Sequence, residues 1–204
     1  GDKISAEELL KVAKEQRLNT YATIKEQGVD FVPTGTFSLY DHVLDMSNTL
    51  GIIPEAYAKS GLSQLDTYFA MARGHQKGGV DLPATEMKKW FDSNYHYLVP
   101  EFSEKSEFKL NDNKPVDDFI EAKEAGYNAR PVVLGPLTLL WLGKTSKDAQ
   151  DPNFNRYSLL PKLAQTYVQL FEKLAAAGAP WVQLDEPILV VDTAKQLSNE
   201  FKQT

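Results

Sequence analysis

The chain has 204 residues, of which 42% are hydrophobic and 25% are charged, a composition typical of a folded protein and not of a disordered one. No run approaches the ~20 consecutive apolar residues that a membrane-spanning helix needs. Acidic residues outnumber basic residues by 28 to 22, which disfavours nucleic acid as a partner. Cysteine is absent, so these residues can form neither a disulfide nor a thiolate-ligated metal site. We expect no membrane partner and a cytoplasmic location.

Apolar residues recur at helical spacing in six segments, and short apolar runs that predict strands lie between them. The first helix is expected to begin at Ser5, which can cap its amino end, and to stop at Gly28. Helices are expected over residues 5–28, 40–50, 63–73, 84–91, 115–125 and 159–177, and strands over residues 29–33, 95–102, 130–136 and 181–189. The apolar segment 137–142 could either continue a strand or form a short helix.

Four strands separated by helices predict parallel β/α units, because parallel neighbours need a long crossover connection that a helix can supply. Each strand ends in polar or glycine-rich residues, at 34–36, 101, 135–138 and 185–187. In β/α folds this is the end of the sheet where ligands bind. A complete (β/α)8 barrel takes ~250 residues. We therefore expect the α/β class and an incomplete (β/α)8 TIM-type barrel, with parallel strands and surrounding helices. A complete open α/β sheet is the alternative.

Two adjacent carboxylates, Asp185 and Glu186, end the last expected strand. Successive side chains alternate across an extended strand, so at most one of the two can face a site at the mouth of a barrel. A general acid and base pair therefore has weak support, and a carboxylate that caps a loop is the favoured interpretation. Pro187 agrees with this interpretation, because proline suits the end of a strand.

The sequence contains three scattered histidines, His42, His75 and His96. His42 follows Asp41 and can share a helix face with Asp45, but a metal site there would need ligands from elsewhere. His96 is expected to share a strand face with Asn94. It could titrate near neutral pH, although a hydrogen-bonded, partly buried histidine is commoner. We assign no catalytic residue and no metal ligand within this chain.

Two lysines, Lys88 and Lys89, precede Trp90 in the expected helix 84–91. Cations at the end of a helix complement its dipole, and this structural interpretation requires no ligand. Alternatively, a lysine placed just before the strand 95–102 could reach an anionic ligand. Glycine-rich motifs that bind dinucleotides or phosphates do not occur in the sequence, and neither does the Gly-x-Ser-x-Gly motif of serine hydrolases.

Longer strings of residues are more specific than these single motifs. The strings 30–44, 86–102, 130–144 and 181–187 closely resemble, in this order, the N-terminal half of cobalamin-independent methionine synthase. The likeness covers nearly the whole chain. It implies that residues 1–204 form a partial N-terminal (β/α)8 barrel of a two-barrel enzyme, with the first strand and the later strands missing.

The resemblance implies a methyltransferase of methionine biosynthesis. Such an enzyme moves a methyl group from 5-methyltetrahydropteroyltri-glutamate, a folate, to the thiol of homocysteine, and it uses no cobalamin. Its zinc lies in the C-terminal barrel of the same chain, the expected partner of this one, where His, Cys, Glu and Cys hold it. The absence of cysteine from these residues agrees with that placement.

The same resemblance implies two substrate-binding residues in this chain. They are Lys89, which directly precedes a Trp-Phe pair, and Asn94, which opens an Asn-Tyr-His-Tyr motif. In the family this half helps to hold the polyglutamate tail of the methyl-folate, and a lysine ammonium is a suitable partner for its carboxylates. The family's opening Phe-Pro-Arg-(Ile/Val)-Gly strand and its basic Arg-Glu-Leu-Lys stretch are missing here. The Asp-Glu-Pro string at 185–187 resembles a homocysteine-contacting motif of the C-terminal barrel and is expected to be structural in this half.

Two other function classes stay open. A non-catalytic α/β binding or scaffold domain would have a similar fold without turnover. A small carbohydrate-active barrel would use acids and aromatic residues at strand ends, but the sequence positions no pair of carboxylates well enough to support it.

Overall fold

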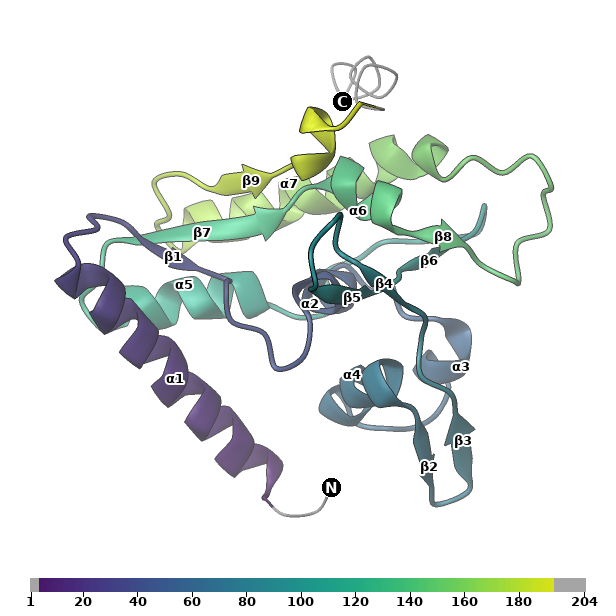
Figure 1. Ribbon diagram of the computed structural model, residues 1–204, viewed down its shortest axis with the longest axis horizontal. Helices are drawn as coiled ribbons and strands as arrows, with labels where there is room; N and C mark the ends of the chain where they lie inside the picture. The colour runs from purple at the N-terminus through teal and green to yellow at the C-terminus, as the bar shows by residue number, and fades with distance from the viewer. Residues whose placement is uncertain (1–3, 193–204) are drawn as a thin grey trace.

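The computed structural model describes residues 4–192 (Figure 1). The helices are α1 (Ala6–Glu26), α2 (His42–Thr49), α3 (Glu55–Ala58), α4 (Gln64–Arg73), α5 (Lys114–Glu124), α6 (Pro136–Leu142) and α7 (Leu160–Ala176), with short 3-10 helices η1 (Arg156–Leu159) and η2 (Pro187–Val190). The strands are β1 (Val32–Thr34), β2 (His75–Lys77), β3 (Val80–Leu82), β4 (Met87–Lys89), β5 (His96–Leu98), β6 (Glu101–Phe102), β7 (Ala129–Leu134), β8 (Lys144–Thr145) and β9 (Gln183–Asp185). Within the described range, no helix combines the length and the apolar character needed to cross a membrane.

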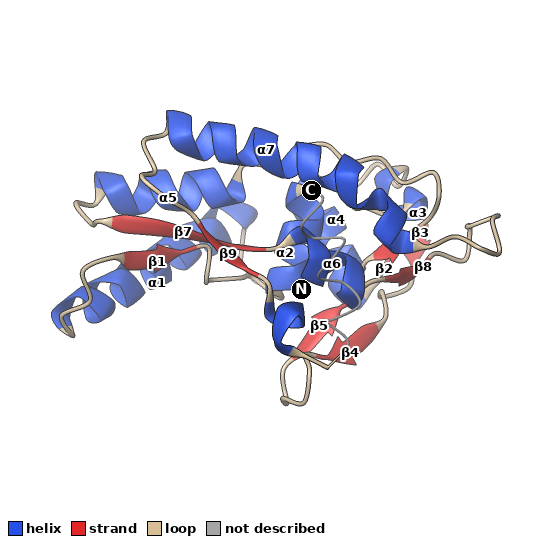
Figure 2. Cartoon of the chain, turned by 90° about the horizontal axis from the view of Figure 1, so that it is seen from above, coloured by secondary structure: helices blue, strands red, loops and turns tan. Residues whose placement is uncertain are grey.

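The centre of the molecule is a three-stranded parallel sheet in the order β1-β7-β9. Ala129 of β7 lies opposite Val32 of β1, and Val132 lies opposite Gln183 of β9. The long connections between these strands contain α5 before β7 and α7 before β9, as parallel neighbours require. Figure 2 shows α5 and α7 running alongside the sheet. The expected α/β class is confirmed, and three of the four expected strands lie in one parallel sheet.

The fourth expected strand, residues 95–102, does not join this sheet. Its first part is β5, which pairs antiparallel with β4, and its last part is β6, which pairs parallel with β8. The expected helix over residues 84–91 is also wrong, because β4 lies within that segment. A helix of two turns is marginal by itself, so pairing with β5 prevails. The turn between the two strands closes where the Trp90 N–H donates to the Tyr95 carbonyl at 2.7 Å.

The ambiguous segment 137–142 forms a helix, α6, which begins at Pro136. Proline suits the first turn of a helix, because its φ is already helical and its missing N–H would have no partner there. Six of the seven residues of α6 are buried, and Trp141 is the partly exposed exception. A helix buried on nearly all sides carries no amphipathic signal, which explains why periodicity left this segment undecided.

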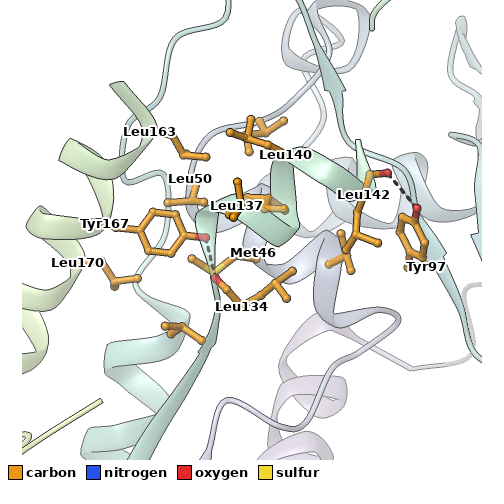
Figure 3. Packing of buried hydrophobic residues seen from close by; sticks show 14 of the residues in the cluster. Met46, Leu50, Tyr97, Leu134, Leu137, Leu140, Leu142, Leu163, Tyr167 and Leu170 are labelled. Carbon is orange, nitrogen blue, oxygen red and sulfur yellow. Dashed lines mark hydrogen bonds between the residues drawn. The ribbon is translucent and has the colours of Figure 1, made fainter. Parts of the chain in front are cut away.

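Two buried tyrosines connect the main core to backbone carbonyls (Figure 3). Tyr167 of α7 donates to the carbonyl oxygen of Leu134 at 2.7 Å, and Tyr97 of β5 donates to that of Leu142 at 2.9 Å. The neighbouring buried side chains include Met46, Leu50, Leu137, Leu140, Leu163 and Leu170. This packing holds α6 and α7 against the carboxyl end of β7, which is the end of the sheet where a ligand site is expected.

The helix α1 extends away from the sheet and is held to α5 by an ion pair (Figure 1). The guanidinium of Arg17 donates two hydrogen bonds to Glu121, both at 2.8 Å, and lies 3.5 Å from Asp118. All three side chains are mostly shielded from solvent. Ser5 caps the start of α1 by accepting a hydrogen bond from the Glu8 N–H, as the sequence predicted.

Candidate functional site

A pocket of about 830 Å³ opens at the carboxyl ends of β1, β7 and β9. Its volume lies in the range of small-molecule sites. Two of the four polar strand ends noted in the sequence contribute to its lining, at 35–36 and 185–187. The third, at 135–138, does not line the pocket, and β7 contributes its last residues, 132–134, instead. Glu101 lines a separate pocket instead. The remaining walls come from α2, from the β4–β5 hairpin and from the start of α5.

Gly35 allows the loop after β1 to approach the sheet closely. Its φ is +81°, in the left-handed region that favours glycine, and a Cβ at this position would lie 2.7 Å from the carbonyl oxygen of Val132. Any side chain here would therefore push the loop away from β7. Because both Gly35 and Val132 line the pocket, this contact sets the pocket's shape on the β1 side.

Asp41 lies beside the pocket, is fully buried and accepts hydrogen bonds from two separate elements. Its carboxylate caps α2 by accepting from the Leu44 N–H at 2.9 Å. It also accepts from the Leu98 N–H at 3.0 Å and from the Tyr95 hydroxyl at 2.6 Å. Asp41 thus joins α2 to the β4–β5 hairpin. Within residues 4–192, no group of three or more His, Asp or Glu side chains is arranged to hold a metal ion.

His42 forms an aromatic wall of the pocket together with Trp90 and Tyr95. The centroid of the His42 ring lies 4.5 Å from the ring centroid of Trp90 and 5.3 Å from that of Tyr95. The Tyr95 hydroxyl gives its hydrogen to Asp41, so its contact with His42 Nδ1 at 3.2 Å requires the proton on that nitrogen. Burial lowers the pKa of His42, although the charge of Asp41 opposes this shift. The imidazole is therefore neutral at physiological pH.

Asp45 of α2 and Lys114 of α5 also line the pocket and form a partly buried ion pair. Their nearest charged atoms are 3.6 Å apart, and Asp45 also accepts from the Tyr68 hydroxyl at 2.6 Å. Burial raises the pKa of Asp45, and Lys114 opposes that effect. The Lys114 ammonium donates to the Phe37 carbonyl at 2.8 Å and to Asp118 at 2.6 Å. The Lys114 ammonium therefore has its partners within the protein.

Glu186 caps the start of α6, which confirms the structural interpretation of the Asp-Glu pair. Its carboxylate accepts from the backbone N–H groups of Leu137 at 2.8 Å and of Thr138 at 2.7 Å, and from the Thr138 hydroxyl. A Cβ on Gly135 would lie 2.2 Å from the Glu186 carboxyl carbon, so the approach requires glycine there. Asp185 accepts from the Gln183 amide at 2.7 Å and lines the pocket.

The two residues predicted to bind substrate, Lys89 and Asn94, lie on the β4–β5 hairpin and are exposed. Lys89 is in strand β4, so its expected role at a helix end is wrong. Among the described residues 4–192, Lys89 has no carboxylate within ion-pair distance. His96 lies opposite Lys89 and is exposed, with Nδ1 3.0 Å from the Asn94 carbonyl oxygen. It is hydrogen-bonded, as expected, but not buried.

The turn that carries Asn94 has an unusual backbone. Phe91 has a φ of 49° and is the only residue other than glycine with a positive φ between residues 4 and 192. Its ring stacks on Trp141 with centroids 5.2 Å apart and an interplanar angle of 15°. Such a conformation costs on the order of 1 kcal/mol and persists where packing enforces it, often at functional sites. The turn is therefore held in one shape.

Sequence reasoning missed the pocket roles of Trp90, Tyr95 and Lys114. No local signal marks them, because the contacts of Tyr95 with Asp41 and of Lys114 with Phe37 join segments far apart in the chain. One signal was available for Asp41, since aspartate directly before a helical run is a favoured N-cap.

Residues 1–204 match the protein family described as "Cobalamin-independent synthase, N-terminal domain". The chain belongs to this family. The resemblance seen in the strings 30–44, 86–102, 130–144 and 181–187 is thereby confirmed.

Curated relatives carry consistent names. A probable 5-methyltetrahydropteroyltriglutamate–homocysteine methyltransferase of Schizosaccharomyces pombe is 50% identical over 207 residues, which cover 98% of this chain and 27% of that protein. The methyltransferase of the same name from Saccharomyces cerevisiae is 50% identical over 93% of this chain and 25% of its own length. One from Chelativorans sp. is 47% identical over 98% and 27%. The chain thus spans about a quarter of the length of the curated relatives it matches.

Proposed function

We propose that this chain is the N-terminal part of a methyltransferase that transfers the methyl group of 5-methyltetrahydropteroyltri-glutamate to homocysteine, giving methionine without cobalamin. The observation that carries the proposal is the family match over residues 1–204, together with relatives about half identical whose names state this reaction. A cytoplasmic location belongs to the same proposal.

We also propose that residues 1–204 form part of a (β/α)8 barrel that is completed in a longer protein and faces a C-terminal barrel. The parallel order β1-β7-β9 and the helical crossovers support this architecture. Within the described residues, β1 and β9 each pair with a single strand, which leaves an edge free for a further strand. The chain's own donors do not suit the zinc of such enzymes, since cysteine is absent and the three histidines lie on different elements. We place the zinc ligands outside this chain.

In this proposal Lys89 and Asn94 bind the polyglutamate tail of the folate. Both are exposed on one rigid hairpin, which Asp41 fixes to α2 through Tyr95. The unpaired ammonium of Lys89 suits a carboxylate-rich tail, and Asn94 can donate from its side-chain amide. The chain supplies no reacting group in this scheme. Its contribution is to orient the substrate.

The experiment is a kinetic comparison in the full-length enzyme. Lys89→Ala should raise KM for the tri-glutamate substrate about fivefold, which corresponds to about 1 kcal/mol, with kcat unchanged. The effect should shrink with a mono-glutamate substrate and in high salt. Lys88→Ala is the matched control, because Lys88 already lies 3.5 Å from Glu86. An equal effect on both substrates would remove the tail-binding role. Absence of methionine formation by the unmutated enzyme would favour a non-catalytic scaffold instead.

A further inference from the structure

Negatively charged groups outnumber positively charged groups in the lining of the pocket. Three carboxylates line it, from Asp45, Asp185 and Glu186, against the single ammonium of Lys114 among the lining residues described. That ammonium already donates to Phe37 and Asp118. It is therefore not free to receive an anionic ligand. The imidazole of His42, which burial keeps neutral, adds no compensating charge.

The three carboxylates differ in what they can still bind. Glu186 accepts hydrogen bonds from three donors of α6. Asp45 accepts a hydrogen bond from Tyr68 and pairs with the Lys114 ammonium. Within residues 4–192, the Asp185 carboxylate accepts a side-chain hydrogen bond only from the Gln183 amide, through one oxygen. The charge of Asp185 also acts to raise the pKa of His42, a residue of the aromatic wall, although burial outweighs it. It is the acid best placed to receive a ligand.

Another part of the pocket lining is aromatic. Trp90, Tyr95 and the neutral ring of His42 stand together, and Tyr40 lines the same pocket with 37% of its surface exposed. Aromatic faces attract organic cations through the negative charge of the ring face, and tryptophan does so most strongly. A carboxylate in the same pocket repels an anion and adds to the attraction for a cation.

We propose that this pocket binds a small organic ammonium ligand, with the cation between Asp185 and the aromatic wall formed by Trp90 and Tyr95. This inference does not rest on the proposed methyltransferase function. It implies that the two parts of this region bind groups of opposite charge. Lys89 on the exposed strand β4 binds anionic groups, whereas the pocket excludes them.

The test uses three probes of matched size on the full-length protein: benzylammonium, neutral benzyl alcohol and anionic benzoate. Binding is measured at pH 7.5 by saturation-transfer NMR and equilibrium dialysis. Benzylammonium should bind at least about tenfold more tightly than benzyl alcohol, and benzoate should not bind in the pocket. Asp185→Asn keeps the side-chain shape and should weaken benzylammonium about tenfold while leaving benzyl alcohol unchanged. Trp90→Leu should weaken both.

Asp148→Asn is the matched control, because Asp148 lines the separate second pocket, and it should leave benzylammonium binding unchanged. The thermal midpoint of each variant shows whether it is folded. If Trp90→Leu does not fold, Asp185→Asn still decides the outcome. Equal affinity for benzylammonium and benzyl alcohol would overturn the proposal, as would no binding at about 10 mM or indifference to Asp185→Asn. Loss of the methyltransferase proposal would show in turnover and not in this assay.

Discussion

The carboxylate of Glu186, directly after β9, lies 2.7 Å from the backbone nitrogen of Thr138 in the first turn of α6. Together with its bond to the Leu137 N–H, this contact joins the end of one parallel strand to the helix that follows its neighbour, β7. Burial raises the pKa of Glu186, while the donors from α6 oppose that shift. In the sequence, Glu186 is a candidate catalytic acid because it follows Asp185 at the end of a strand. In the structure it caps a helix.

Replacing Glu186 should therefore reduce stability and not reactivity. Glu186→Ala leaves buried N–H groups of α6 without an acceptor, and we expect the free energy of unfolding to fall by about 2–3 kcal/mol. Glu186→Gln keeps one acceptor and should have a smaller effect. Urea unfolding measures both, with Asp185→Asn as the neighbouring control because Asp185 caps no helix among residues 4–192. Similar stability for Glu186→Ala and Asp185→Asn would contradict the capping role.

The hydroxyl groups of the two core tyrosines should each stabilise the fold. Tyr167→Phe leaves the carbonyl of Leu134 without this donor in the buried core, and should cost about 1–2 kcal/mol. Tyr97→Phe should cost about 1 kcal/mol through the carbonyl of Leu142. Tyr40→Phe is the control, since Tyr40 is partly exposed. Thermal unfolding measures the midpoint of each of the three variants. Equal midpoints would contradict a stabilising role for the two core hydroxyl groups.

The ion pair between α1 and α5 should depend on the shape of the arginine. Arg17→Lys keeps the charge but loses the two parallel hydrogen bonds to Glu121, and we expect a loss of about 1–2 kcal/mol. The exposed pair of Lys59 with Glu55 provides the contrast. Lys59→Ala should change stability much less than Arg17→Lys does, because solvent screens the exposed pair. Chemical denaturation tests both variants, and equal losses would show that shielding from solvent does not strengthen the Arg17 pair.

His42 should make the protein less stable in mild acid. Burial lowers its pKa in the folded state below the usual 6.5, although Asp41, Asp45 and Asp185 oppose the shift. Between the folded pKa and pH 6.5 the unfolded chain binds more protons, so stability falls as the pH drops through this window. The raised pKa values of Asp45 and Glu186 act in the other direction.

Comparison of the wild type with His42→Gln isolates the histidine, because the carboxylates are present in both proteins. The urea midpoint of the variant should fall less than that of the wild type between about pH 7 and about pH 5. Parallel pH profiles for the two proteins would mean that His42 titrates normally in the folded state.

Features that depend on neighbouring residues could be predicted from the sequence. Ser5 and Gly28 bound the region of α1, the apolar run after Arg130 forms the central strand, and the absence of cysteine excludes a thiolate site. The family was also readable, because long ordered strings are specific. Helical periodicity and capping act over a few residues, so they leave a local record.

The hairpin and the pocket depend on contacts between distant segments, which the sequence did not reveal. The segment 84–91 has helical spacing, yet β4 pairs with β5, and that preference depends on a partner strand. Asp41, Tyr95 and Glu186 acquire their roles from donors and acceptors about 50 residues away. A carboxylate's role depends on which donors surround it after folding, and burial then adjusts its pKa. The sequence contains the groups, but only chain packing determines which of them meet.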